Sequence, residues 1–246
     1  MPKDNRIIFG IHAVLEAVDA GRDLDKVFLK RGPSSELLGQ LLAELRRREI
    51  PFQQVPAEKL NRMTRKNHQG VVAWLSEITY NDITSVLPAI FESGEDPLIL
   101  VLDGITDVRN FGAIARSAEC AGVHAIVIPS SESAAINADA IKTSAGALHR
   151  IRVCRHRNLP SITRFLRESG LRLFAATEKA EDVLYKSELT GPLGIIMGSE
   201  EKGVSPALLK DADHWVSIPM KGKTSSLNVS VATGIILFEV TRQRGL

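Results

Sequence analysis

The sequence predicts an α/β protein with two units, a small one at the N-terminus and a larger one built on a parallel sheet. From residue 98 onward, short apolar runs of strand length alternate with segments of helical periodicity. Such alternation is typical of a parallel sheet covered by helices on both faces. A shorter alternation of the same kind occupies residues 11–75. The 246 residues are enough for both units.

In the first 75 residues the pattern predicts helices and strands in alternation. The expected helices span residues 11–20, 36–48 and 58–65, and the expected strands span 26–29, 52–55 and 70–75. The next segment ends in the run FESGEDP, whose acidic, Gly and Pro residues are typical of a linker, although a short helix at 83–91 also fits. We therefore predict an N-terminal domain at 1–75, a linker at 76–96 and a C-terminal domain at 97–246.

The C-terminal domain is expected to hold six strands, each followed by a loop and, in most cases, a helix. The predicted strands span 98–102, 124–129, 150–154, 171–176, 193–197 and 214–218, and the helices 111–121, 136–146, 159–168, 205–210 and 227–243. The loop after the first strand, DGITDVRNFG, lacks the G-x-G-x-x-G pattern of a Rossmann site. A dinucleotide site of that kind is therefore disfavoured.

Composition argues against several classes of protein. The first residues, MPKDNRIIFG, lack the apolar core of a signal peptide, and no apolar run approaches the length of a membrane span. Cys120 and Cys154 have no metal-site spacing, and the histidines form no H-E-x-x-H or H-x-x-E-H pair. We expect a reduced, cytoplasmic protein without a metal site.

Positive charge is concentrated in the N-terminal part. Residues 1–75 contain thirteen Lys or Arg against nine Asp or Glu, whereas the rest of the chain has 18 against 20. One cluster is Arg46–Arg48, and a second comprises Lys59, Arg62, Arg65 and Lys66. Such clusters fit a grip on a phosphate backbone. The alternative is a solvated helix face, which is the better reading of Arg46–Arg48 taken alone.

Three polar clusters follow apolar strands of the C-terminal domain. Asn110 and Arg116 follow the first strand, and Glu200 follows the fifth. Ser226 and Asn228 lie at the junction between the loop after the sixth strand and the last helix. Each cluster alone has an ordinary explanation, such as a helix cap, a solvated charge or a tight turn. Together they predict one shared site, because open α/β sheets bind ligands beyond the carboxyl ends of their strands.

These clusters resemble the three motifs of the SpoU/TrmH branch of the SPOUT methyltransferases. The first motif, N-x-G-x-x-x-R, is matched by Asn110, Gly112 and Arg116. The second and third, G-x-E-x-x-G and S-L-N-V-S, are matched at residues 198–203 and 226–230. The segments FGIHAVLEAV from Phe9 and NHQGVVA from Asn67 are similar to the substrate-binding domain of the ribosomal RNA guanosine 2′-O-methyltransferases in this family.

The resemblance implies a fold and an activity that periodicity does not reveal. The fold would be a parallel sheet whose C-terminal segment forms a deep trefoil knot, a rare exception to ordinary chain connections. The activity would be methyl transfer from S-adenosylmethionine to the ribose 2′-hydroxyl of a guanosine in large-subunit ribosomal RNA, carried out by a homodimer joined through the C-terminal domain. A transfer-RNA methyltransferase and a non-catalytic RNA-binding protein on the same fold remain alternatives.

The same resemblance assigns roles to the motif residues. Arg116 would grip a phosphate and stabilise the developing alkoxide, since a guanidinium stays protonated in proteins. Asn110 and Asn228 would orient the ribose and the methionine tail. Ser226 would bind the reacting sugar or the Arg116 network. Glu200 would fix the loops by pairing with Arg116 or with backbone amides.

Two further sets of residues are implied as binding sites. The cofactor would contact Gly198, Ile218 and Leu227, between walls formed by Thr177, Met197 and Met220. In the N-terminal domain the residues expected to bind RNA are Arg46, Arg62, Arg65, His68 and Gln69. A polar turn at the start of a strand is the alternative for His68 and Gln69.

Overall fold

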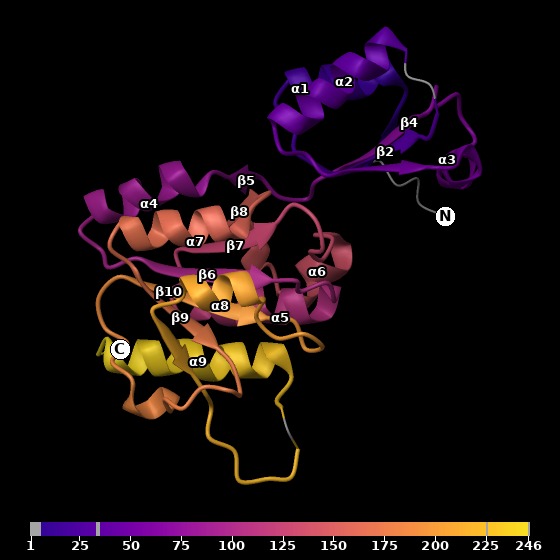
Figure 1. The fold of residues 1–246 in the computed structure, drawn as a ribbon. Coiled ribbons are helices and arrows are strands. Elements are labelled where there is room, and N and C mark those ends of the chain that lie inside the picture. Colours follow the sequence, from indigo (N-terminus) through magenta and orange to yellow (C-terminus); the bar gives the residue numbers. More distant parts are fainter. Residues whose placement is uncertain (1–5, 33–34, 225, 246) are drawn as a thin grey trace. The chain divides into compact units, whose positions relative to one another are not determined.

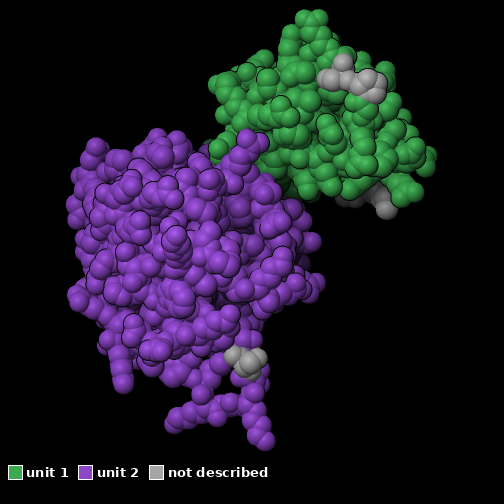
Figure 2. Space-filling view, in the orientation of Figure 1, with its two compact units in different colours: residues 1–79 green, residues 80–246 purple. Residues whose placement is uncertain are grey.

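The computed structural model describes residues 6–32, 35–224 and 226–245. The chain divides into two compact units, Met1–Thr79 and Tyr80–Leu246 (Figure 2). The first unit contains a mixed sheet, and the second contains a parallel sheet with helices on both faces (Figure 1). The predicted α/β class is confirmed.

The first unit is a four-stranded sheet with helices on both faces. Its elements are β1 (Ile7–Phe9), α1 (Ile11–Asp19), β2 (Leu24–Lys30), α2 (Glu36–Arg47), β3 (Phe52–Val55), α3 (Ala57–Met63) and β4 (Val71–Leu75). The strand order is β1-β4-β2-β3, with β2 and β3 parallel and the other pairs antiparallel. Val27 and Leu29 of β2 pack against α1 and α2, whereas Phe28 between them packs against Leu60 of α3. Successive side chains of β2 thus point to opposite faces of the sheet, as expected for a strand.

The second unit contains a seven-stranded sheet in which every pair is parallel. Its strands are β5 (Tyr80–Asn81), β6 (Leu98–Asp103), β7 (Ala125–Pro129), β8 (Arg152–His156), β9 (Arg172–Ala176), β10 (Leu193–Gly198) and β11 (His214–Val216). The order across the sheet is β11-β9-β10-β6-β7-β8-β5. The last strand ends two residues before the predicted limit of 218.

Helices cover both faces of this sheet (Figure 1). They are α4 (Ile83–Glu92), α5 (Val108–Cys120), α6 (Ala138–Thr143), α7 (Leu159–Glu168), α8 (Pro206–Asp211) and α9 (Val229–Gln243), with short 3₁₀ helices at Ala147–His149 and Leu184–Lys186. Ile99 and Val101 of β6 share a buried cluster with α4, α7 and α8. The alternate residues Leu98, Leu100 and Leu102 are buried on the opposite face, where α5 packs against α9.

The boundary between the units lies between Thr79 and Tyr80. Most of the segment predicted as a linker, 76–96, therefore belongs to the second unit. β5 pairs with β8, and Ile83, Leu87 and Ile90 of α4 are buried in its core. The reason is the three- and four-residue spacing of these apolar side chains, which gives α4 a face that has to be covered.

The described part of the chain contains no helix that is both long and apolar enough to cross a membrane. Cys120 and Cys154 are both free thiols. Cys154 lies buried in β8, and this burial raises the pKa of its thiol to about 12. The thiol of Cys154 therefore stays protonated at neutral pH.

Glu239 is a buried carboxylate on α9, with 7% of the residue exposed. It accepts hydrogen bonds from Arg242 Nε at 2.9 Å and from Gln243 Nε2 at 2.7 Å. The bond from Arg242 contributes most, and together these bonds lower the pKa of Glu239 from 4.5 to about 2. Because the folded-state pKa is depressed, the ionised group stabilises the fold above about pH 4.5, and this contribution is lost as the pH falls toward 2.

We predict that Glu239→Gln lowers the free energy of unfolding at pH 7 by about 1–3 kcal/mol. Urea denaturation at pH 7, 5 and 3.5 measures the effect: the difference from the unmodified protein should be similar at pH 7 and 5 and smaller at pH 3.5. Glu92→Gln, at an exposed position on α4, is the control and should change little. A difference that does not depend on pH would contradict the depressed pKa.

Candidate active site

The carboxyl ends of β6 and β10 lie side by side, and the sheet extends from them in opposite directions. β10 pairs with β6 so that Met197 lies opposite Leu102 and Gly198 lies opposite Asp103. From β6 the sheet continues through β7 to β8, whereas from β10 it continues through β9 to β11. A reversal of strand order of this kind is where open α/β sheets bind ligands. The first two polar clusters follow these two strands.

Asp107 begins helix α5. Its side chain accepts a hydrogen bond from the backbone N–H of Asn110 at 2.7 Å, as an N-cap residue does. The sequence predicts a start near Phe111, with Asn110 as a possible cap, but the helix begins at Val108. Because Asp107 is the cap, the side chain of Asn110 is available for contacts outside the helix.

Gly112 of the first motif allows α5 and α6 to pack closely. A Cβ atom at this position would lie 2.7 Å from Thr143 Cβ and 2.9 Å from the carbonyl oxygen of Ala140. Any side chain would push the two helices apart. This glycine is therefore explained by helix packing.

The three polar clusters meet at the side chain of Asn228. Asn228 Nδ2 donates to Asn110 Oδ1 at 3.0 Å and to Glu200 Oε1 at 2.5 Å. The same oxygen of Glu200 accepts from the backbone N–H of Val229 at 3.2 Å. Of the partners expected for Glu200, the structure thus shows a backbone amide. We call Asn110, Glu200 and Asn228 the polar hub.

Both polar atoms of the Asn228 side chain form hydrogen bonds within the protein. Its Oδ1 caps α9 by accepting from Ser230 N at 3.0 Å, Ser230 Oγ at 2.5 Å and Val231 N at 3.4 Å. Both hydrogens of its Nδ2 group are used in the polar hub. The geometry therefore makes Asn228 a positioning residue. Asn110 has its carbonyl oxygen fixed by Asn228, and its own amide hydrogens have no partner within the described residues.

A cavity of about 400 Å³ opens beside the polar hub, and we call it the first cavity. All six residues expected to contact a cofactor line it, together with Ser226: Thr177, Met197, Gly198, Ile218, Met220 and Leu227. They come from the ends of β9 and β10, the loop after β11 and the approach to α9. The lining of the first cavity mixes apolar side chains with charged and polar ones, among them Glu178, Lys179 and Lys202, which suits an organic ligand that carries polar groups.

Gly198 passes directly against the turn that follows it. A Cβ atom on Gly198 would lie 2.0 Å from Gly203 C and 2.1 Å from Val204 N. The backbone N–H of Gly203 also donates to Ser199 O at 2.8 Å, which closes the turn. The resemblance implies that Gly198 contacts the cofactor, and in the structure the atoms closest to this position belong to the chain itself.

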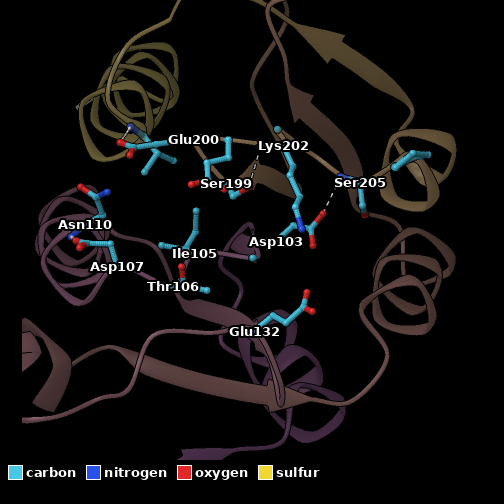
Figure 3. Close-up of a pocket in the computed structure, with 15 residues that line it drawn as sticks. Asp103, Ile105, Thr106, Asp107, Asn110, Glu132, Ser199, Glu200, Lys202 and Ser205 are labelled. Carbon is cyan, nitrogen blue, oxygen red and sulfur yellow. Dashed lines mark hydrogen bonds between the residues drawn. The ribbon is translucent and has the colours of Figure 1, made fainter.

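A second cavity, of about 450 Å³, shares residues 199–203 and Val229 with the first (Figure 3). Asn110 lines it, and it carries a group of carboxylates: Asp103, Asp107, Glu132, Glu200 and Glu201. Sequence reasoning missed Asp103, Asp107 and Glu132. The position of Asp103 at a strand end was a usable signal, and so was the spacing of Asp107 from Asn110. Within the described residues, no group of His, Cys, Asp and Glu side chains could hold a metal ion.

Arg116 lies on a different face of α5 from Asn110. At about 100° per residue, positions six apart are separated by roughly 120° around the helix. Arg116 is exposed and lines neither cavity. Within the described residues its guanidinium has no hydrogen-bond or ion-pair partner. It is therefore free to bind a group supplied from outside the chain.

The first unit contains a cationic cavity of about 690 Å³, which we call the N-terminal cavity. Three of the residues expected to bind RNA line it, namely Arg65, His68 and Gln69. Lys66 of the second basic cluster also lines it, as do Lys30 and Arg31, which the sequence did not single out. No Asp or Glu among the described residues lines it. His68 is fixed in its wall, because Nε2 lies 2.8 Å from Asn61 Oδ1 and Nδ1 accepts from Gly70 N at 2.9 Å.

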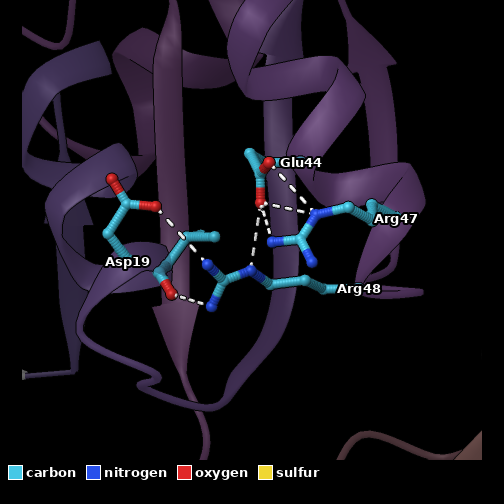
Figure 4. A network of polar contacts seen from close by, with 5 residues as sticks. Asp19, Glu44, Arg47 and Arg48 are labelled. Carbon is cyan, nitrogen blue, oxygen red and sulfur yellow. Dashed lines mark hydrogen bonds and ion pairs between the residues drawn. The ribbon is translucent and has the colours of Figure 1, made fainter.

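Arg46 and Arg62 lie outside the N-terminal cavity. The guanidinium of Arg46 lies 6.0 Å from the centre of the Phe52 ring. Its neighbours Arg47 and Arg48 bind Glu44 at 2.6 and 3.1 Å, and Arg48 also reaches Asp19 (Figure 4). The hydrogen bonds from Arg47 and Arg48 lower the pKa of Glu44. Most of this arginine cluster is thus paired with carboxylates on its own surface.

Comparison with known proteins agrees with this geometry. Residues 97–238 match the SpoU rRNA Methylase family, and residues 7–80 match the RNA 2′-O ribose methyltransferase substrate-binding family. The chain is 42% identical to the 23S rRNA (guanosine-2′-O-)-methyltransferase RlmB of Yersinia pestis, over 98% of this chain and 99% of the relative.

Solved structures also resemble the chain. The SpoU methyltransferase AviRb of Streptomyces viridochromogenes, in complex with the cofactor AdoMet, superposes with a TM-score of 0.61 at 25% identity, covering 96% of this chain and 89% of AviRb. The TrmH/SpoU tRNA modifying enzyme of A. aeolicus is 32% identical, with a TM-score of 0.56, over 61% of this chain and 76% of that enzyme. This chain therefore belongs to the SpoU rRNA methylase family.

Proposed function

We propose that this protein transfers a methyl group from S-adenosylmethionine to the ribose 2′-hydroxyl of a guanosine in 23S ribosomal RNA. The observation that carries the proposal is the polar hub, which joins three distant motifs beside a cavity lined by all six expected cofactor residues. The full-length relatives named as 23S rRNA guanosine methyltransferases support the RNA target. The TrmH/SpoU tRNA modifying enzyme of A. aeolicus, in contrast, matches 61% of this chain and not its full length.

The residues of the site fit S-adenosylmethionine, which when bound supplies a methyl group on a positively charged sulfur. Gly198 leaves room at the turn, and Met197, Ile218 and Leu227 give the first cavity an apolar wall. The protein must then hold the ribose hydroxyl in line with the methyl group and stabilise the charge that develops on its oxygen. Asn110 offers amide N–H groups for the first task.

Arg116 is suited to the second task. Its guanidinium offers a planar set of N–H donors and has no partner among the described residues. It can therefore bind a phosphate of the RNA and stabilise the alkoxide without breaking a bond within the protein. Glu200 and Asn228 serve by fixing Asn110 and the start of α9.

The N-terminal unit is proposed to bind the RNA backbone through the N-terminal cavity. Lys30, Arg31, Arg65 and Lys66 bring positive charge to one concave surface without a facing carboxylate among the described residues. Binding of this kind releases counterions and weakens as salt is added. Arg46 and Arg62 are proposed as peripheral contacts outside it. With ribosomal RNA as partner, we place the protein in the cytoplasm.

A homodimer joined through α9 is also proposed. Val231 and Phe238 are both 51% exposed and lie seven residues apart, so they share one face of the helix. Leu227, just before the helix, adds a further exposed apolar side chain. An apolar stripe of this kind supports burial against a second copy. Light scattering should then give twice the chain mass of 26.9 kDa.

A trefoil knot in the second unit is the remaining proposal. It is supported by family membership. The bond from Val229 N to Glu200 Oε1 draws the start of α9 back to the turn 199–203. A threaded chain end would make refolding slow, because the end must pass through a preformed loop.

Methyl transfer to defined RNA tests the proposed function. We expect purified protein with labelled S-adenosylmethionine to methylate 23S ribosomal RNA transcribed in vitro, and nuclease digestion to yield 2′-O-methylguanosine. Bulk transfer RNA should remain unlabelled. Label in transfer RNA alone would favour the transfer-RNA alternative. A protein that binds RNA but not S-adenosylmethionine in calorimetry would be a non-catalytic member of the family.

A further inference from the structure

The second cavity adjoins both the first cavity and the polar hub. It shares the turn 199–203 and Val229 with the first cavity, and Asn110 of the polar hub lines it. A volume of about 450 Å³ lies within the range of sites that take small organic groups. Enzymes that do chemistry on a base turn its nucleotide out of the stack into a pocket, and a pocket that takes the base would also present its ribose to the polar hub. The inference below rests on the proposed methyl transfer to RNA.

Most carboxylates of the second cavity already have tasks within the protein. Asp107 caps α5, Asp103 Oδ2 accepts from Ser205 N at 2.8 Å, and Glu200 belongs to the polar hub. Glu132 and Glu201 differ from them, because neither carboxylate accepts a hydrogen bond from any described residue. Of these two, Glu132 lies on a loop of its own, away from the turn 199–203. Figure 3 shows it on the opposite side of the cavity from Glu200. Glu132 is therefore available to a ligand.

The loop that carries Glu132 is anchored on both sides. The backbone N–H of Ser130 donates to His156 O at 2.9 Å, which ties the start of the loop to β8. The backbone N–H of Ala134 donates to Ile105 O at 2.8 Å, which ties its end to the loop before α5. The position of Glu132 relative to Asn110 is thus set by main-chain bonds.

The chemistry of this cavity selects its ligand. Among the described residues that line it, the cavity holds one cation, Lys202, beside its carboxylates. An ionised carboxylate accepts hydrogen bonds and repels phosphates, so the part of the ligand that meets Glu132 must present N–H donors. Guanine presents two adjacent donors, N1–H and the N2 amino group, at the spacing of the two carboxylate oxygens. Adenine and cytosine place a ring acceptor beside their amino group, and uracil flanks its single N–H with two carbonyl oxygens. We infer that the second cavity receives the target guanine and that Glu132 accepts both donors of its Watson–Crick edge.

The test combines Glu132→Gln with removal of the guanine amino group. Synthetic RNA carries either guanosine or inosine, which lacks N2, at the methylated position. With guanosine, we expect Glu132→Gln to lower kcat/KM about 10- to 100-fold, since a bidentate contact of this kind is worth roughly 1–3 kcal/mol. Changing guanosine to inosine should lower kcat/KM of the unmodified protein about tenfold or more, whereas it should lower kcat/KM of the Glu132→Gln variant only about twofold.

Two readouts separate this inference from other faults. The affinity for S-adenosylmethionine and the Tm of Glu132→Gln should be unchanged, and Glu168→Gln, at an exposed position on α7, should behave like the unmodified protein. An equal loss on inosine in both proteins, or full activity of Glu132→Gln on guanosine, would overturn the role of Glu132. If the unmodified protein methylates neither RNA, the proposed function itself is wrong.

Discussion

Alanine at position 198 is expected to abolish binding of S-adenosylmethionine. Its Cβ would lie 2.0 Å from Gly203 C and 2.2 Å from Gly203 O, and these are main-chain atoms that no side-chain rotation can move. The turn 199–203 would have to shift, and it lines both cavities. We expect Gly198→Ala to lower the free energy of unfolding by about 3 kcal/mol, as in strongly overpacked cores. Calorimetry with S-adenosylmethionine and urea denaturation measure the two effects.

Gly234→Ala is the matched control for this prediction. A Cβ at Gly234 in α9 would lie 3.7 Å from Ser117 Oγ, which is an ordinary contact. Alanine is favoured over glycine inside a helix by about 0.5–1 kcal/mol, so this variant should be at least as stable as the unmodified protein and should bind the cofactor normally. Normal cofactor binding by Gly198→Ala would show that the turn tolerates displacement and does not shape the first cavity.

The location of the site could be predicted from the sequence because it depends on local patterns. Asn110, Glu200 and Asn228 each follow an apolar run or precede a helix, and strands of a parallel sheet end at one edge. The bonding among them could not be predicted. Asn228 and Asn110 are 118 residues apart in the chain, and only the fold brings their side-chain amides into contact.

The domain boundary shows a different limit of sequence reasoning. β5 consists of Tyr80 and Asn81 alone, and a strand of two residues has no periodicity to detect. The acidic and glycine-rich run lies after α4, and it suggests a linker that continues to residue 96. The decisive contacts are those that bury Ile83 and Leu87 against the sheet, and they join parts of the chain that are distant in sequence.

Glu132 shows why part of the proposed binding surface escapes prediction. It lies in an irregular loop, where neither period nor motif marks a residue, and its position depends on the bond between Ala134 and Ile105. The same holds for Lys30 and Arg31, which look like ordinary charges at a strand end. Their proposed role in RNA binding rests on the fold, which places them in one cavity with Arg65.

The site combines fixed and free groups, and this contrast predicts how its variants will differ. The members of the polar hub hold one another, so removing one disturbs the others as well as the reaction. Arg116 is exposed and unpaired within the described chain, so its removal should leave the fold intact. A substitution at Arg116 therefore reports on the reaction more directly than a substitution in the hub.

Arg116→Ala is expected to lower kcat/KM for methyl transfer by at least about 100-fold, comparable to the loss of one group that stabilises an oxyanion. Its Tm and its affinity for S-adenosylmethionine should be unchanged. Arg116→Lys keeps the charge but loses the planar fork, so it should recover only part of the activity. Arg164→Ala, at an exposed position on α7, is the control and should remain fully active. Undiminished transfer by Arg116→Ala would exclude the guanidinium from the reaction and leave Asn110 as the remaining donor to the ribose.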